Sequence, residues 1–424
     1  MAIDSDVLVI GGGMAGIFAA LSAARTGGDV RLLSYKQSTL AQASGLVDVI
    51  GYTPDGEGPV VDPFETIPEL PDEHPYSTVG VDGVRDALGI FDDVADRYRG
   101  EHTASNALVP THGGTVKPTA RYPAAAAPGI ASAERDTLLV GFDALVDFDA
   151  PHAAAHLEAA GVPFDVDGVT IRFPGDLNAD AKVTRYAKVL DQNSDVAVDG
   201  RPRRVRDALA DAVDPHLDGA ERVGFPAVLG DDDPGAVRTA LESALDVPVF
   251  EVPMGPPSLP GLRLEDDLYA ALDAAGVSME TGNPVVGYDG DDRVAEVSID
   301  RNGAKIPFTA DQFVLATGGL VGKGLGSDRD GVREPIFDCH VPHDDDRYEW
   351  FETDAFGDHS FARFGLPTDE QLRPLDADGD AEFENLRAAG SVLGGFDFAA
   401  EKSGSGVSIA TGHAAGVAAA EEAR

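Results

Sequence analysis

The stretch Val7-Leu8-Val9-Ile10-Gly11-Gly12-Gly13-Met14-Ala15-Gly16 decides the fold. Its first four residues are apolar, which predicts a strand buried on both faces, as in a parallel sheet. The alanine-rich segment 17–25 predicts a helix that ends at Gly27. A second apolar run, 30–33, predicts the next strand. The stretch therefore predicts a βαβ unit with glycines between strand and helix.

Three of these glycines, Gly11, Gly13 and Gly16, fit the pattern G-x-G-x-x-G. The first permits a tight turn, the second lets a phosphate approach the backbone, and the third lets the helix pack on the strand. The helix that begins near Met14 would offer unpaired N–H groups and a positive dipole end to that phosphate. We therefore predict a nucleotide phosphate site at these four residues.

The acidic residue that usually accompanies this pattern is missing. A carboxylate about 20 residues on, at the end of the second strand, ordinarily holds a ribose hydroxyl. This chain has Ser34 there, followed by Tyr35 and Lys36. The difference favours FMN, or an unusual mode of FAD binding, over a standard dinucleotide.

A second glycine-rich stretch stands near the C-terminus. Gly395 and Asp397 precede Gly404-Ser405-Gly406-Val407 and a long helix of small residues. A helix beginning there would suit the negative charge that gathers on the pyrimidine ring of a reduced flavin. The alternative is a helix that packs tightly and binds nothing, since Gly412 and Gly416 allow a close neighbour.

Further candidates lie where strands end. The apolar strand 313–316 ends in Thr317-Gly318-Gly319, and Gln37, Ser38, Ser44 and Gly45 follow the second strand. Loops at strand ends reach the ligand in such folds, although Ser and Gly also favour simple turns.

The whole pattern predicts an α/β fold. We expect a Rossmann-like flavin-binding domain with a parallel sheet, formed by residues 1–60 and 265–424. An inserted α+β second domain would occupy residues 61–264 and face the substrate or a partner.

Charge and cysteine content limit the function further. The net charge is -42, and only seven of the 32 basic residues are lysines. Such a surface repels nucleic acid and anionic lipid. Its carboxylates also repel one another, but in molar salt the Debye length is only about 3 Å, so this repulsion is screened. The charge therefore indicates a halophilic protein.

The single cysteine, Cys339, cannot hold an iron–sulfur cluster alone. The chain shows no spanning run and no signal segment, so we expect a cytoplasmic protein without direct membrane insertion.

Blocks spread over nearly the whole chain resemble the B subunit of the anaerobic glycerol-3-phosphate dehydrogenase family. Besides the first glycine turn, they are Gln37-Ser38-Thr39-Leu40 with Ser44-Gly45 and Asp48; His74-Pro75-Tyr76; Gly141-Phe142 with Leu145, Asp147 and Phe148; Pro256-Pro257-Ser258 with Gly261 and Arg263; and Gly394-Gly395-Phe396-Asp397, Glu401 and Gly404-Ser405-Gly406-Val407.

The resemblance implies a subunit that carries FMN. Its expected partners are an FAD-containing catalytic subunit and a membrane-associated iron–sulfur subunit, which would hold the chain at the inner face of the cell membrane. Together they would oxidise sn-glycerol 3-phosphate to dihydroxyacetone phosphate and pass electrons towards quinone. It also favours Thr317-Gly318-Gly319 as a flavin contact.

No catalytic base is identified by the sequence. His74 and His112 could move protons, and Lys117 and Arg263 could bind an anion, unless these two are solvated surface charges. Arg201, Arg203 and Arg204 form a basic cluster on a surface or interface. Two other functions stay open: an independent flavin-dependent oxidase or dehydrogenase of a small hydroxy or amino acid, and a cofactor-free structural subunit.

Overall fold

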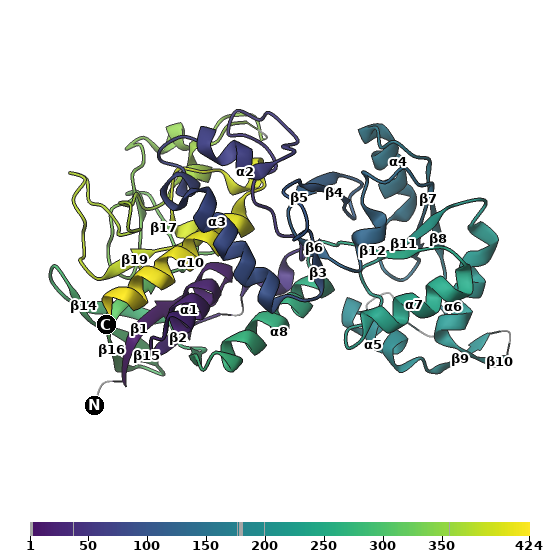
Figure 1. Cartoon of the computed structure of the whole chain (residues 1–424), viewed down its shortest axis with the longest axis horizontal. Helices are drawn as coiled ribbons and strands as arrows, with labels where there is room; N and C mark the ends of the chain where they lie inside the picture. The colour runs from purple at the N-terminus through teal and green to yellow at the C-terminus, as the bar shows by residue number, and fades with distance from the viewer. Residues whose placement is uncertain (1–2, 37, 176, 178–180, 199, 356) are drawn as a thin grey trace. The chain divides into compact units, whose positions relative to one another are not determined.

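The computed structural model describes residues 3–36, 38–175, 177, 181–198, 200–355 and 357–424. The chain forms two compact units: unit 1 comprises residues 1–39, 48–96 and 266–424, and unit 2 comprises residues 40–47 and 97–265 (Figure 1). This division and the predicted one share the boundary near residue 265 and differ at residues 40–47 and 61–96. The predicted domain limits stay a prediction.

A parallel sheet forms the centre of unit 1. The first strand, β1 (Ile3–Ile10), lies between β2 (Val30–Ser34) and β16 (Ala304–Leu315), and β13 (Ser278–Thr281) extends the sheet beyond β2. All of these neighbours run parallel. Residues 7–10 of β1 are almost inaccessible to solvent, as the apolar run predicted. The predicted α/β class with a parallel sheet is confirmed.

Strand β16 changes partner along its second edge. Its first half pairs antiparallel with β15 (Val294–Arg301), which forms a hairpin with β14 (Val285–Gly290). Its last residues pair parallel with β19 (Leu386–Ala388). The buried Asn385, directly before β19, links this strand to β15. Its side-chain oxygen accepts from the Val294 N–H, and its side-chain NH₂ group donates to the Val294 carbonyl.

Two helices pack against each other with their backbones close. Helix α1 (Met14–Thr26) lies beside α10 (Gly404–Glu422), as the purple and yellow ribbons of Figure 1 show. A Cβ atom added to Gly412 or Gly416 of α10 would overlap carbonyl oxygens of α1. The close approach that these glycines predicted is therefore confirmed. Helix α3 (Pro75–Val94) also packs on α10.

Unit 2 contains a four-stranded parallel sheet. The strand order is β12 (Val249–Val252), β11 (Arg222–Pro226), β7 (Thr137–Phe142) and β8 (Val166–Ile171). The intervening helices are α4 (Ala150–Ala160), α5 (Val183–Gln192), α6 (Val205–Val213) and α7 (Pro234–Leu245). Because strands and helices alternate, this unit is α/β in detail rather than α+β.

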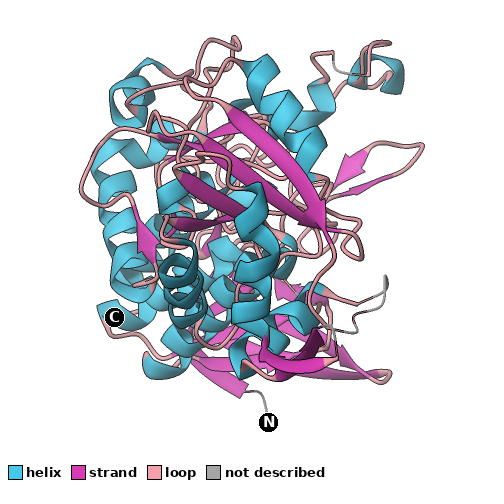
Figure 2. Ribbon diagram, turned by 90° about the vertical axis from the view of Figure 1, so that its right-hand side faces the viewer, coloured by secondary structure: helices cyan, strands magenta, loops and turns pink. Residues whose placement is uncertain are grey.

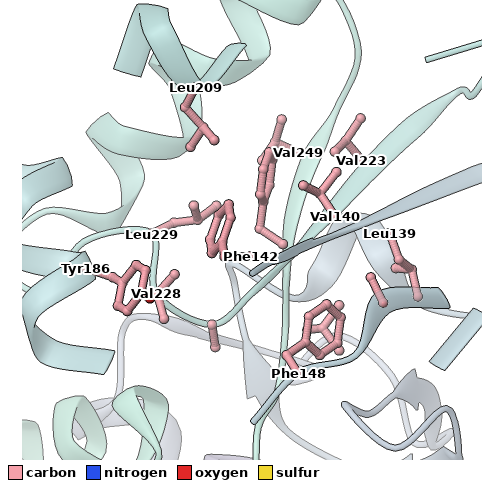
Figure 3. Close-up of a cluster of buried hydrophobic side chains, with 14 of the residues drawn as sticks. Leu139, Val140, Phe142, Phe148, Tyr186, Leu209, Val223, Val228, Leu229 and Val249 are labelled. Atoms are coloured by element: carbon pink, nitrogen blue, oxygen red, sulfur yellow. The ribbon is translucent and has the colours of Figure 1, made fainter. Parts of the chain in front are cut away.

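The core of unit 2 gathers around aromatic rings. Phe142 and Tyr186 stack with ring centroids 5.9 Å apart, and Val228 is buried in the same cluster (Figure 3). The family block at Gly141-Phe142 thus contributes to the core of this unit.

Helix α8 (Leu259–Ala274) begins with residues of unit 2 and ends with residues of unit 1. The remaining elements are short. Figure 2 shows the helices, strands and loops of the chain in different colours. The other helices are α2 (Pro63–Thr66) and α9 (Phe398–Glu401), with 3-10 turns η1 (Thr39–Gln42), η2 (Ile67–Glu69), η3 (Ala127–Gly129), η4 (Asp214–His216), η5 (Arg347–Trp350), η6 (Ser360–Arg363) and η7 (Gly390–Val392). The strand pairs are β3 (Tyr98–Arg99) with β6 (Tyr122–Pro123), β4 (Ala107–Pro110) with β5 (Val116–Thr119), β9 (Asp195–Val198) with β10 (Arg201–Arg204), and β17 (Gly326–Ser327) with β18 (Val332–Arg333). Each helix in the described part of the chain is too short or too polar to span a lipid bilayer.

Candidate nucleotide-binding site

The glycine turn after β1 requires glycine at two positions for steric reasons. Gly11 has a φ of 122°, and a Cβ there would overlap the carbonyl oxygen of Ala316 at the end of β16. A Cβ on Gly16 would overlap the carbonyl oxygen of Gly11. Both residues therefore keep the first turn of α1 tight against the ends of two neighbouring strands.

Gly13 differs from both, because a Cβ on it would meet nothing within 4 Å. It is the N-cap of α1, and no side chain caps the helix there. The first N–H groups of α1, beginning at Met14, therefore have no side-chain acceptor at this end and border open space. A helix start of this kind fits an anionic phosphate group.

The end of β2 carries no carboxylate. Ser34 is buried, and its hydroxyl donates to the Lys36 carbonyl oxygen at 3.1 Å. The next residue, Tyr35, is 53% exposed. A Cβ on Gly12 would lie within 2.7 Å of the Ser34 Cβ, so Ser34 packs against the turn itself.

The end of β16 provides an unpaired polar atom beside the turn. The Thr317 hydroxyl is buried and has no hydrogen-bond partner among the described residues. Its backbone nitrogen would lie 3.0 Å from a Cβ on Gly11, so it borders the glycine turn. A buried hydroxyl without a partner is costly, and a bound ligand would satisfy it. Gly318 follows with a φ of 88°, and a Cβ on Gly319 would lie 2.5 Å from the Ser391 carbonyl oxygen.

Segments far apart in the sequence meet at the start of α10. The Ser405 hydroxyl accepts a bond from the Asp48 N–H at 2.8 Å, and the Gly406 N–H donates to the Asp48 carbonyl at 2.7 Å. The Tyr76 hydroxyl donates to the Val49 carbonyl at 2.7 Å. A Cβ on Gly406 would overlap that hydroxyl. The first turn of α10 is therefore held in a fixed place by two other segments.

The Glu401 side chain holds the segment that leads into α10. Its Oε1 accepts from the Asp397 N–H at 2.8 Å, and its Oε2 accepts from the Ser403 hydroxyl at 3.0 Å. His74 Nε2 lies 3.1 Å from that Oε2, while His74 Nδ1 accepts from the Tyr76 N–H. The proton of a neutral His74 is therefore on Nε2, where it donates to the carboxylate. His74, Glu401 and Ser403 are buried, and both carboxylate oxygens of Glu401 accept bonds within the protein.

Comparison with known proteins identifies the family. Residues 6–407 match the family described as FAD binding domain. A curated relative from Halobacterium salinarum, named as the probable B subunit of an anaerobic glycerol-3-phosphate dehydrogenase, is 69% identical over 99% of both chains. The chain belongs to this B-subunit family.

More distant members of the B-subunit family cover almost the same length. The relative from Vibrio cholerae, strain O395, is 31% identical over 96% of this chain and 94% of its own.

A solved structure, a 3-ketosteroid-delta4-(5alpha)-dehydrogenase from Rhodococcus jostii, is 14% identical to this chain. The alignment covers 99% of this chain and 97% of that one, with a TM-score of 0.41. The match of residues 6–407 to the family described as FAD binding domain shows that the chain carries a flavin-binding domain.

The blocks that carry the resemblance to the B-subunit family are divided between the two units. Unit 1 holds the glycine turn, Ser38, Thr317-Gly318-Gly319, and the segment from Gly395 to Val407. Asp397 caps α9 through bonds from Ala399 and Ala400, and Gly395 has a φ of 84°. Ser44 and Gly45 belong to unit 2, where the Ser44 hydroxyl accepts from the Leu46 N–H. Gln37 lies outside the described residues.

The proposed proton and anion groups are mostly engaged. Arg263 is 7% exposed and forms a bidentate ion pair with Glu251 at 2.7 and 3.1 Å, so the interpretation as a solvated surface charge is wrong for it. The ring of His112 accepts a bond from the Gly255 N–H. Lys117 lies on β5 in unit 2 and is half-buried.

The remaining candidates lie on the surface or in the core. Arg203 and Arg204 are exposed and pair with Asp211 and Asp195 respectively.

Burial raises the pKa of the Cys339 thiol, so this cysteine stays protonated. Within the described part of the chain, no cluster of His, Cys, Asp and Glu could hold a metal ion.

The sequence reasoning missed the buried contacts of Glu401 with His74. It singled out His74 as a candidate base, whereas the structure places both ring nitrogens in bonds within the protein. Since 327 positions separate the two residues, no local pattern could have joined them. The only signal was that both lie in blocks shared with the B-subunit family.

Proposed function

We propose that this chain is the flavoprotein subunit of a glycerol-3-phosphate dehydrogenase complex. The complex oxidises sn-glycerol 3-phosphate to dihydroxyacetone phosphate and passes electrons towards quinone. The observation that carries the proposal is the uncapped start of α1 at Gly13, bordered by open space and by the unpaired Thr317 hydroxyl. The names of relatives that match the full length of the chain support the substrate.

The flavin would be held at three points of unit 1. The amides of Gly13 and Met14 hold the phosphate, with Gly11 and Gly16 shaping the turn. The Thr317 hydroxyl and the backbone of Gly318 and Gly319 bind the ring system. The start of α10, from Gly404 to Val407, places a positive helix end where reduction adds negative charge. The bound flavin supplies hydride acceptance, and the chain supplies binding and orientation.

The flavin is either FMN, which has no adenosine ribose, or FAD, whose adenosine ribose the protein must also hold. We propose FMN, because Ser34 offers no carboxylate to an adenosine ribose and its hydroxyl already bonds Lys36. The matching family is described as an FAD binding domain, which indicates FAD as the alternative. FAD would then need other residues to hold its second ribose.

The partners follow from the same proposal. A lone cysteine cannot carry electrons in a cluster, so electrons enter or leave through other subunits. We propose an FAD-containing catalytic subunit and a membrane-associated iron–sulfur subunit. The chain would then be a cytoplasmic protein, peripheral at the inner face of the cell membrane through its partner.

The test is to purify the chain in molar KCl and record its absorption spectrum. Heat then releases the nucleotide, whose mass distinguishes FMN from FAD. Glycerol 3-phosphate oxidation is assayed with an artificial acceptor, with and without partner subunits. We expect FMN, and slow turnover until the partners are added.

Each other outcome points to a different function. Full turnover by the chain alone would show an independent dehydrogenase or oxidase, and failure to reduce the flavin with glycerol 3-phosphate in the full complex would exclude this substrate. A colourless folded protein would show a structural subunit without cofactor.

A further inference from the structure

A groove in unit 1 opens a few residues beyond Thr317. Lys323, Leu325 and Ser327 line it after the strand end, and Trp350, Phe351 and Phe361 line it from a later segment. Its volume is about 480 Å³, which lies in the range of small-molecule sites, roughly 300–1,000 Å³. Since Thr317 borders the glycine turn, the groove begins a few residues along the chain from the proposed flavin site.

Aromatic side chains line one side of this groove, and the orientation of one of them is fixed by contacts within the protein. The Trp350 Nε1–H donates to the Asp344 carbonyl at 2.8 Å, and the ring meets His343 and Phe364 edge-on. Trp350 is therefore held in one orientation. Phe351 and Phe361 are 50% and 40% exposed. Exposed rings beside a fixed indole favour a planar ring that can stack or pack edge-to-face with them.

The charge of the groove is unlike that of the rest of the chain. The chain has 74 acidic residues, yet none lines the groove, whereas one of its seven lysines does. Among the residues that the structure describes, neither the Lys323 nor the Ser327 side chain has a hydrogen-bond or ion-pair partner. The groove thus offers two free donors and no carboxylate, which suits a ligand with acceptor oxygens.

We propose that this groove binds the planar ring of a quinone, with its carbonyl oxygens toward Lys323 and Ser327. The inference rests on the proposed function, because a complex that oxidises an alcohol needs an acceptor. The alcohol loses two electrons and two protons on becoming a ketone, and the quinone takes up both pairs to become a hydroquinone. A phosphate substrate fits the groove less well, since three aromatic rings and one lysine line it.

Trp350 makes the proposal directly measurable, because it is the single tryptophan of the chain. We would titrate the full chain, in molar KCl and without substrate, with menadione, a small naphthoquinone. We expect saturable quenching of the Trp350 fluorescence. Lys323→Gln should raise the dissociation constant about tenfold, as expected for the loss of a charged hydrogen-bond donor. Phe361→Ala should also weaken binding.

Matched controls keep the result specific. Lys305→Gln removes another exposed lysine, at the far end of β16, and should leave the curve unchanged. 2-Methylnaphthalene has the same rings without carbonyls, so it should compete poorly and equally in the native protein and in Lys323→Gln. Quenching should persist when the partner subunits are bound.

Three results would overturn the proposal. They are quenching that never saturates, identical curves for the native protein and Lys323→Gln, and loss of quenching because partner subunits cover the groove. The titration involves no turnover, so an inactive preparation does not affect it. Conversely, absence of quenching leaves glycerol 3-phosphate oxidation through another acceptor intact.

Discussion

Gly13 is the residue on which the proposed phosphate site depends. Gly13→Glu should keep the fold, since the new side chain enters open space and φ at this position is −84°. It should abolish flavin retention, because a carboxylate would occupy the space meant for a phosphate. The measurement compares flavin absorbance per protein with far-UV circular dichroism.

Gly89→Glu is the matched control for that experiment. Gly89 lies exposed in α3, and a Cβ there also meets nothing within 4 Å. This variant adds the same charge and should keep its flavin. Flavin bound by folded Gly13→Glu would place the phosphate elsewhere.

The Glu401 side chain joins His74 to the segment 397–403 that leads into α10. In Glu401→Gln one oxygen becomes an NH₂ group, which must face the Asp397 N–H or the donors on His74 and Ser403. His74 cannot escape by moving its proton, because its Nδ1 accepts from Tyr76. We expect a loss of about 2–4 kcal/mol in unfolding free energy.

Guanidinium unfolding at constant KCl measures this loss. Glu370→Gln, an exposed position, should change stability by less than about 0.5 kcal/mol. Equal effects of the two substitutions would show that the bonds of Glu401 add nothing beyond its charge.

At the scale of elements, the contact between α1 and α10 relies on glycine. In Gly416→Ala the added methyl would overlap the Ala19 carbonyl oxygen and push the helices apart. We expect a loss of about 1–3 kcal/mol, as in overpacked cores. Gly89→Ala makes the same chemical change in an open helix position and should stabilise by about 0.5–1 kcal/mol. Thermal unfolding should therefore shift in opposite directions for the two variants.

The elements that the sequence predicted are those with a local signal. Residues 7–10 are apolar, three of them are β-branched, and Gly11 follows them, so strand, turn and helix could be predicted together. The parallel order of β7, β8, β11 and β12 had no such signal, because it depends on pairing between segments tens of residues apart.

The candidate site was predictable to the same extent. The open space at Gly13 followed from spacing within one turn. The contact of Asp48 with Ser405 and Gly406 did not, because local sequence pattern says nothing about which distant backbone groups meet. The ion pair of Arg263 with Glu251 was missed for a related reason: the arginine stands beside turn residues, which usually lie at the surface.

At the scale of the whole molecule, we expect the net charge of -42 to govern stability. At low salt the Debye length is about 10 Å or more, so neighbouring carboxylates repel one another, and near 1 M it falls to about 3 Å. We expect the chain to lose native structure in dilute buffer and to regain it near molar KCl. Far-UV circular dichroism across a KCl series measures this, and an unchanged spectrum in dilute buffer would contradict the halophilic interpretation.

The pairing of α1 with α10 also sets the order of events during synthesis. The glycine turn is translated almost four hundred residues before α10, the helix that packs against α1 and that we propose borders the same site. A growing chain on the ribosome carries α1 with its alanine face uncovered until α10 has emerged. We therefore expect the flavin to bind only after α10 has been translated, and a nascent chain that stalls before Gly404 to carry no flavin.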